Sequence, residues 1–277
     1  MTAPGERLGI EHLSVFGLPP VEFVHLVADL GCRYLATGLA AAPYNPHGYP
    51  SFSLKDDPAL RREMIAAMSD RGCRSHSAKA SRCGKAGTSP IARTISRSWQ
   101  NLACGGSTPV TMEPDLGRSF DQFGKLAEMA AILGMETTVE FGPGLSVGDL
   151  PTAVAAVHHL DRPDFRLLID TMHFGRTGSG PADIAALDPG LIGYVQLSDA
   201  PLQPRCPTYM EEAMFERMVP GEGELPLREI LAAVPPDVII GIEVPLRSQA
   251  EAGIGPEERL RPCVEAARAL LPDGAPT

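Results

Sequence analysis

Short apolar runs alternate with amphipathic helical patterns along most of this chain, and this alternation limits the possible folds more than any other feature. Apolar runs of strand length are followed by segments with apolar residues at helical spacing, several of which end at glycine. Strands separated by helices indicate βαβ units and a parallel sheet. Strands are expected within 8–17, 32–39, 135–141, 164–174, 191–199 and 237–245, and helices within 20–31, 57–72, 119–134, 147–160, 181–188, 226–234 and 256–271.

The helix expected at 57–72 has the clearest local signals. Asp57 stands at its start, where an aspartate side chain accepts hydrogen bonds from the free backbone N–H groups of the first turn. Gly72 follows its last turn, and glycine adopts the left-handed conformation that ends many helices. We therefore expect one complete helix between these two residues.

The number of strand–helix pairs predicts a (β/α)8 TIM barrel. The chain has 277 residues, and such a barrel takes roughly 250. Eight pairs are reached if the atypical segment 74–108 contains one of them. A doubly wound sheet is the alternative, and it is disfavoured because no GxGxxG sequence follows an expected strand. We predict a single TIM-barrel domain over residues 1–277.

The segment 74–108 differs from the rest of this acidic chain. It has six Lys or Arg residues, seven Ser and no Asp or Glu, while the whole chain has 34 acidic and 24 basic residues. A basic nucleic-acid-binding loop is one interpretation, and a Ser-rich linker is another, although long structureless loops are uncommon within compact domains. A third follows from the genetic code, because a shifted reading frame permits a strand end, a helix end and a strand start here. We therefore expect the barrel to be disrupted at about 73–109 by a compensated frameshift, in the gene or in its reported sequence.

The composition argues against several partners and locations. A formal net charge of −10 repels phosphate backbones, so no nucleic-acid partner is expected. No apolar run approaches the length of a membrane span, and the first residues lack a signal-peptide pattern. The six cysteines are scattered without a CxxC pair, which is typical of a reducing compartment. We expect a cytoplasmic protein without a membrane partner.

Polar side chains stand at the ends of four expected strands in the second half of the chain. Active sites of TIM barrels lie at the C-terminal ends of the strands, which meet at one face. Several carboxylates at one mouth repel one another unless a divalent cation lies between them. Oxygen-rich ligation suits Mn²⁺ or Mg²⁺ best, with Co²⁺ and Zn²⁺ left open. The polar residues are Glu140, Asp170, His173, Gln196, Asp199 and Glu243.

Each of these residues also has a purely structural interpretation. Glu140 and Glu243 could be salt-bridged strand ends. Asp170 and His173 could form a helix-cap pair, and Gln196 could bond to a neighbouring backbone group. Four candidates on four consecutive strands favour the metal interpretation.

Asp199 and His12 are less specific candidates. Asp199 is better explained as a loop cap, or as a partner that orients a ligand, than as a ligand itself. His12, in "IEHLSVF", is either a satisfied core histidine or a substrate-binding residue.

These motifs resemble the xylose isomerase-like TIM barrels, a family of sugar phosphate isomerases and epimerases that also includes inosose and 3-dehydroshikimate dehydratases. The resemblance covers most of the chain. It is carried by "VEFGP", "LIDTMHFGRTG", "YVQLSDAP", "RMVPGEGELPL" and "GIEVP". It implies a metal ion held by Glu140, Asp170, Gln196 and Glu243. It also implies that His173 binds substrate and that Arg217 anchors a substrate oxygen.

Gln196 departs from the family pattern, because many of the epimerases have histidine at this position. An amide oxygen can ligate a hard cation, but it is a weaker donor than imidazole. Some dehydratases of the family resemble this chain in having glutamine here. The departure weakens the tie to the sugar epimerases and strengthens the dehydratase alternative.

The resemblance implies a metal-dependent isomerase or epimerase that acts on a hydroxy-carbonyl substrate. Glu140 and Glu243 would transfer the proton through a metal-bound enediolate. A dehydratase of the 3-dehydroshikimate or inosose type is the alternative, and a non-catalytic binding barrel is a third. An apurinic endonuclease would need a histidine-rich zinc cluster and a basic DNA face, which seven His and a net charge of −10 do not supply. The expected partner is a small-molecule substrate, and a homo-oligomer stays open.

Overall fold

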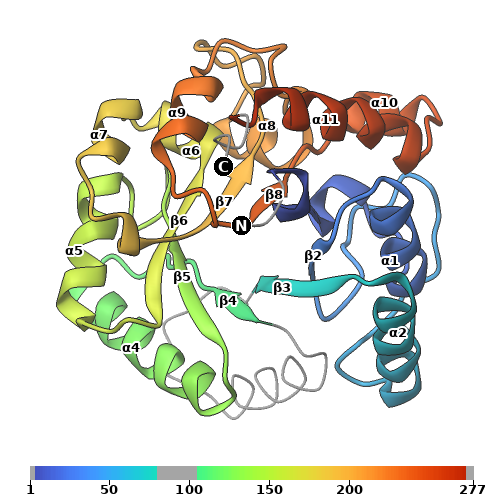
Figure 1. Ribbon diagram of the computed structural model, residues 1–277, viewed down its shortest axis with the longest axis horizontal. Coiled ribbons are helices and arrows are strands. Elements are labelled where there is room, and N and C mark those ends of the chain that lie inside the picture. The colour runs from blue at the N-terminus through green and yellow to red at the C-terminus, as the bar shows by residue number, and fades with distance from the viewer. Residues whose placement is uncertain (1–3, 80–104, 273–277) are drawn as a thin grey trace, which may run out of the picture.

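Eight parallel strands close into a barrel in the computed structural model, which describes residues 4–79 and 105–272 (Figure 1). Each strand pairs with its neighbours in chain order, and the first pairs with the last. The strands are β1 (Leu8–Glu11), β2 (Tyr34–Thr37), β3 (Arg74–Lys79), β4 (Gly106–Thr108), β5 (Glu136–Glu140), β6 (Phe165–Asp170), β7 (Ile192–Leu197) and β8 (Ile240–Ile242). The predicted (β/α)8 barrel is confirmed, and a single domain over 1–277 stays a prediction.

Helices surround this barrel and connect its strands (Figure 1). The α-helices are α1 (Pro20–Asp29), α2 (Pro58–Arg71), α4 (Leu116–Ile132), α5 (Leu150–Leu160), α6 (Thr171–Arg176), α7 (Pro181–Ala185), α8 (Tyr209–Phe215), α9 (Leu227–Ala233), α10 (Arg247–Glu251) and α11 (Pro256–Leu270). Short 3₁₀ segments are η1 (Pro4–Arg7), η2 (His12–Val15) and η3 (Pro189–Leu191). None of the helices in the described ranges is both long and apolar enough to span a bilayer.

Local capping chemistry sets several element boundaries. The Asp57 side chain accepts hydrogen bonds from the backbone N–H groups of Ala59 and Leu60, and Gly72 ends α2 with φ of 67°, which confirms both predicted signals. The strand predicted at 164–174 ends earlier, because Asp170 caps α6 through the backbone N–H of His173. A polar cap thus converts an apolar run into a strand followed directly by a helix.

The barrel core explains why the strand sequences are apolar runs rather than alternating patterns. Parallel strands in a barrel are covered by helices outside and by packed side chains inside. Every residue of β7 is buried, and every residue of β6 except Arg166 is buried as well. Phe123 of α4 packs against Phe165 of β6, with ring centroids 5.9 Å apart, which ties a helix to the sheet.

The atypical segment supplies two of the barrel strands. β3 pairs with β2 and β4, and β4 pairs with β5, so the barrel closes through this region. A register shift lies where β3 passes from Ser75 to Ser77, and the buried Ser75 hydroxyl makes no hydrogen bond among the described residues. The third helix expected here falls at 80–104, outside the described residues. The frameshift therefore stays a prediction.

His76 in β3 should make stability depend on pH. Its ring lies between those of Tyr34 and Tyr194, and burial, followed by the charge of Arg166, lowers its pKa to about 4. In the unfolded chain a histidine titrates near pH 6.5. Between these values the unfolded chain binds a proton that the folded chain does not, so stability falls as the pH decreases from about 6.5 to about 4.

We expect His76 to remove about 1–2 kcal/mol of unfolding free energy between about pH 7.5 and about pH 5. Urea unfolding of the wild type and of His76→Gln at both pH values measures this loss. The variant should lose less stability than the wild type over this range. Equal losses in the two proteins would show that His76 does not contribute.

Candidate metal centre

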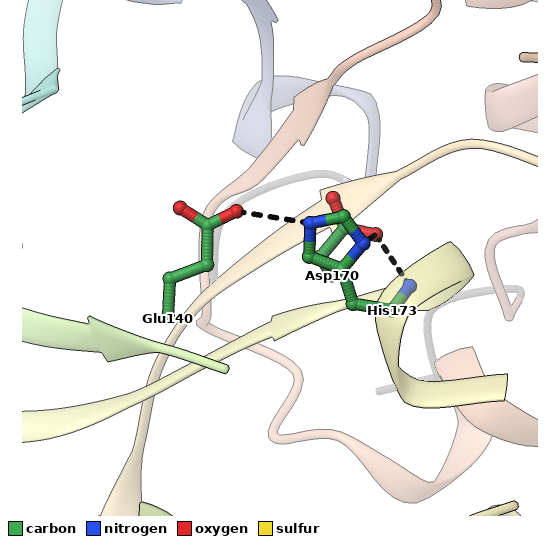
Figure 2. Close-up of side chains that lie close together, drawn as sticks. All are labelled: Glu140, Asp170 and His173. Carbon is green, nitrogen blue, oxygen red and sulfur yellow. Dashed lines mark hydrogen bonds and ion pairs between the residues drawn. The ribbon is translucent and has the colours of Figure 1, made fainter. Parts of the chain in front are cut away.

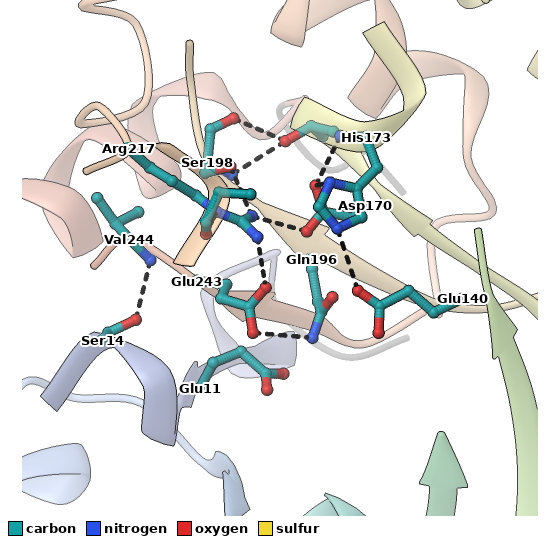
Figure 3. A network of polar contacts seen from close by, with 12 residues as sticks. Glu11, Ser14, Glu140, Asp170, His173, Gln196, Ser198, Arg217, Glu243 and Val244 are labelled. Carbon is teal, nitrogen blue, oxygen red and sulfur yellow. Dashed lines mark hydrogen bonds and ion pairs between the residues drawn. The ribbon is translucent and has the colours of Figure 1, made fainter. Parts of the chain in front are cut away.

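The four predicted ligands meet at one end of the barrel (Figure 3). Glu140 and Asp170 are the last residues of β5 and β6, Gln196 lies near the end of β7, and Glu243 directly follows β8. Asp170 is paired in register with Gln196 on the neighbouring strand. The Gln196 amide donates a hydrogen bond to Glu243 Oε1 at 3.3 Å. All four side chains are buried, so carboxylate charge is concentrated in the barrel mouth.

His173 lies beside two of these carboxylates (Figure 2). Its Nε2 is 3.3 Å from Glu140 Oε1, and its Nδ1 is 3.7 Å from Asp170 Oδ1. One potential ligand atom from each of the three residues lies within 4.8 Å of the others. The residue predicted to bind substrate is thus part of the same polar group as two predicted metal ligands.

Gly142 allows the His173 ring to take this place. A Cβ atom on Gly142 would lie 2.9 Å from His173 Cδ2 and 3.0 Å from Cγ, closer than side-chain carbons pack. The glycine follows Glu140 by two residues in the "VEFGP" motif. This motif therefore provides both the carboxylate and the space for the imidazole that contacts it.

A buried guanidinium joins Asp170 to Glu243. Arg217 donates to Asp170 Oδ2 at 2.7 Å and lies 3.0 Å from Glu243 Oε2. It also donates to the Ser198 hydroxyl at 3.1 Å and to the Ala213 carbonyl at 2.8 Å. Arg217 is only 4% exposed, and its guanidinium bonds to two of the predicted metal ligands, Asp170 and Glu243. Its predicted role as a substrate anchor stays a prediction.

This ion pairing favours the charged forms of Asp170 and Arg217. Burial raises the pKa of Asp170, but the Arg217 guanidinium lowers it, and the result lies below the usual value. Burial lowers the pKa of Arg217, but Asp170 and Glu243 raise it above its ordinary value. The Asp170 carboxylate and the Arg217 guanidinium therefore stabilise each other's charged form in the barrel mouth.

The residues fit a divalent cation in charge and in chemistry. Three carboxylates and one guanidinium leave a net charge of about −2, which one divalent cation would neutralise. Gln196 Oε1 is buried and makes no hydrogen bond among the described residues, although a buried polar oxygen normally has a partner. A hard cation would be such a partner, so Glu140, Asp170, Gln196 and Glu243 form a plausible ligand set.

Asp199 organises the turn that carries Arg217. Its carboxylate accepts backbone hydrogen bonds from Ala200 at 2.8 Å, Gly221 at 2.8 Å and Leu225 at 3.2 Å. Asp199 and Met218 also form a short antiparallel bridge. The loop-cap interpretation of Asp199 is confirmed, and through this turn it helps to place Arg217.

His12 lies in η2, at the end of β1. A Cβ atom on Gly38, in the loop after β2, would lie 3.1 Å from His12 Nε2. The ring thus packs beside the β2 loop. Its predicted contact with substrate stays a prediction.

Three polar residues of the site were missed from the sequence. Tyr194 of β7 donates to Glu11 Oε1 of β1 at 2.5 Å, inside the barrel, where a side chain on Gly241 would clash with both groups. Glu11 stands in the apolar run of the first expected strand, next to His12, and the sequence pattern gave no signal for it. Tyr209 of α8 contacts His173, and burial raises the pKa of Tyr209 above its ordinary value. No periodic pattern marked the short helix that carries it.

Comparisons with known proteins agree with this architecture. The chain resembles the solved structure of the IOLI protein with a zinc atom, at 16% identity and a TM-score of 0.73, over 95% of this chain and 96% of that one. A xylose isomerase domain containing protein from Salmonella typhimurium LT2 has 16% identity and a TM-score of 0.73, over 98% and 99%. D-allulose 3-epimerase from Methylomonas sp. has 14% identity and a TM-score of 0.69, over 96% and 98%.

At these identities the similar structures show the fold alone, and no curated protein sequence matches the chain. The sequence profile of one family does match, over residues 101–263, which is more than half of the chain. This match includes every strand that carries a predicted metal ligand. The chain therefore belongs to the xylose isomerase-like TIM barrel family.

Proposed function

We propose that this chain is a divalent-metal-dependent isomerase or epimerase that acts on a small hydroxy-carbonyl substrate. The observation that carries the proposal is the ring of three buried carboxylates and one buried amide at the C-terminal end of the barrel. An oxygen-rich set of this kind suits Mn²⁺ or Mg²⁺. Solved structures with the same fold include a D-psicose 3-epimerase and a D-allulose 3-epimerase, which supports this choice of reaction. Another contains a bound zinc atom, which supports a metal centre.

Glu140 and Glu243 are the two residues suited to move a proton. Glu140 ends β5 and Glu243 directly follows β8, and β6 and β7 lie between them around the barrel. The two glutamates can therefore reach a substrate in the barrel mouth from different directions. When bound, a divalent cation would polarise the substrate carbonyl and acidify the neighbouring C–H bond. One glutamate can then remove the proton and the other can return it.

The surroundings of the two glutamates differ. Glu243 is paired with Arg217 and accepts a hydrogen bond from Gln196. Glu140 lies against His173, which holds its carboxylate from one side. In the proposed reaction, one base is thus held by an ion pair with Arg217 and the other lies against the His173 imidazole.

A dehydratase is the second candidate, and Gln196 is the observation that favours it. The same proton removal next to a carbonyl leads to loss of a β-hydroxyl if that group is positioned to leave. Where many of the epimerases have an imidazole, which is a stronger metal ligand, Gln196 has a neutral amide whose buried oxygen makes no hydrogen bond among the described residues. The nature of the substrate decides between the two outcomes.

Incubation with Mn²⁺ in deuterated water tests the proposal directly. A panel of ketoses, inososes and 3-dehydroshikimate should contain a substrate whose α-proton is exchanged for deuterium. Recovery of an epimer or isomer supports the preferred reaction, and formation of an unsaturated product supports the dehydratase. Absence of both exchange and product across the panel, with metal bound, would favour a non-catalytic barrel.

A further inference from the structure

Ser14 contacts the backbone on both sides of Glu243. Its hydroxyl donates to the Ile242 carbonyl at 3.1 Å and accepts from the Val244 N–H at 2.9 Å (Figure 3 shows the Val244 contact). Ser14 lies in η2, directly after β1, and its side chain is fully buried. A single hydroxyl thus spans the residue that the proposed function uses both as a metal ligand and as a base.

These two bonds continue the sheet beyond the end of β1. In a parallel pair, a residue of one strand donates its N–H to a carbonyl of the neighbouring strand and accepts the N–H two residues further on. β1 pairs with β8 as far as Ile10 and Ile242, and the chain then turns into η2. The Ser14 hydroxyl makes the next pair of bonds in place of a strand residue, because a hydroxyl can donate and accept at once.

The opposite edge of the same segment is bonded to β7. The Glu243 N–H donates to the Leu197 carbonyl at 3.0 Å. Backbone groups of successive strand residues point to opposite sides, so Ser14 holds segment 242–244 on the β1 side and Leu197 holds it on the β7 side. Without the Ser14 hydroxyl, this segment would lose its bonds on the β1 side.

Arg259 of α11 fixes Ser14 in this position. Its guanidinium donates to the Ser14 carbonyl at 3.3 Å and to the Ile254 carbonyl at 3.1 Å. It also lies over the Phe16 ring, 5.1 Å from the ring centroid, and Arg259 is buried. The hydroxyl that contacts segment 242–244 is therefore carried by a turn that is attached to the outer layer of the barrel.

A second hydroxyl at the barrel mouth makes a similar pair of bonds. Thr171 Oγ1, directly after β6, donates to the Ser198 carbonyl at 2.6 Å and accepts from the Ser198 N–H at 3.0 Å. A threonine side chain can therefore bond to a strand end in this way, which makes Ser14→Thr the conservative variant.

We propose that Ser14 is a positioning residue whose hydroxyl fixes the backbone of segment 242–244 and so places the Glu243 carboxylate among the proposed metal ligands. Glu243 directly follows β8, so its side chain starts from backbone that β1 no longer pairs with. The consequence for metal binding rests on the proposed function, while the two backbone bonds do not.

Amide hydrogen exchange of the metal-free protein, followed by NMR, tests the backbone bonds without metal or substrate. In the wild type, the Val244 amide should exchange as slowly as the Glu243 amide. In Ser14→Ala the Val244 amide should exchange about tenfold faster, the effect of losing one hydrogen bond, and Ser14→Thr should restore slow exchange. Fast exchange of Val244 in the wild type would overturn the proposal, even if the variants fail to fold. Unchanged exchange in a folded Ser14→Ala would overturn it as well.

Titration of chelator-treated protein with Mn²⁺ tests the consequence for the metal. Ser14→Ala should bind Mn²⁺ about 10–100-fold more weakly than the wild type, the usual effect of losing a group that orients a ligand, and Ser14→Thr should recover most of this affinity. Ser119→Ala is the matched control, because Ser119 is equally buried and its hydroxyl also donates to a backbone carbonyl, that of Glu113 at 3.0 Å. Ser119→Ala should bind Mn²⁺ like the wild type, even if urea unfolding shows that it loses as much stability as Ser14→Ala.

Equal Mn²⁺ affinities in Ser14→Ala and Ser119→Ala would limit the Ser14 hydroxyl to fold stability and would contradict a positioning role. Absence of Mn²⁺ binding to the wild type would count against the proposed function. It would not count against the bonds of Ser14 to segment 242–244, which the amide exchange measures by itself.

Discussion

Replacing Arg217 with leucine should lower the free energy of unfolding of the metal-free protein by about 3–5 kcal/mol. Leucine keeps much of the apolar volume but leaves Asp170 and Glu243 buried without their shared cation. Removing one partner of a buried ion pair is costly because the remaining charge stays out of water. This single substitution leaves two buried carboxylates, Asp170 and Glu243, without their counter-charge.

Urea unfolding of Arg217→Leu and of Arg261→Leu separates this effect from the loss of any arginine. Arg261 pairs with Glu257 one helical turn away, and both side chains are about half exposed. Exposed pairs of this kind contribute less than about 1 kcal/mol. Similar losses in the two variants would show that the guanidinium at the barrel mouth is not the main counter-charge for Asp170 and Glu243.

Replacing either candidate base with glutamine should reduce turnover strongly. Glu140→Gln and Glu243→Gln keep the shape of the side chain but remove the group that accepts the proton, and general-base catalysis contributes about 10²–10⁴-fold. Each variant should lower kcat by a factor in this range. Deuterium exchange into the substrate, followed at saturating substrate, measures the loss.

Glu136→Gln is the matched control on the same strand. Glu136 begins β5, at the opposite end of the barrel from Glu140, and its half-exposed side chain pairs with Arg166. Its kcat should stay within about twofold of the wild type, since surface substitutions away from a site change little. Full exchange in Glu140→Gln and Glu243→Gln would exclude both glutamates as bases.

The fold was predictable because its signals are local and repeated. Apolar runs and helical spacing recur along the chain, and caps such as Asp57 and Gly72 act within one helical turn. The convergence of Glu140, Asp170, Gln196 and Glu243 was predictable because parallel strands bring their C-terminal ends to one face, whatever the details of packing. That these residues bind a metal stays a prediction. These features depend on the order of residues and hardly on precise geometry.

The contacts that complete the site could not be predicted in the same way. Arg217 meets Asp170 across 47 positions of sequence, and Tyr209 meets His173 across 36. No spacing rule links such residues. Short helices such as α6 and α8 give too few turns for a periodic pattern, so the position of Tyr209 depends on tertiary contacts alone.

The direct test of a metal centre is titration of chelator-treated protein with Mn²⁺, followed by calorimetry or electron paramagnetic resonance. The wild type should bind one ion per chain at the barrel mouth. Asp170→Asn should lose this binding while remaining folded, because asparagine can still cap α6 through the backbone N–H of His173. No saturable binding to the wild type, or unchanged binding to Asp170→Asn, would contradict a metal centre built from these residues.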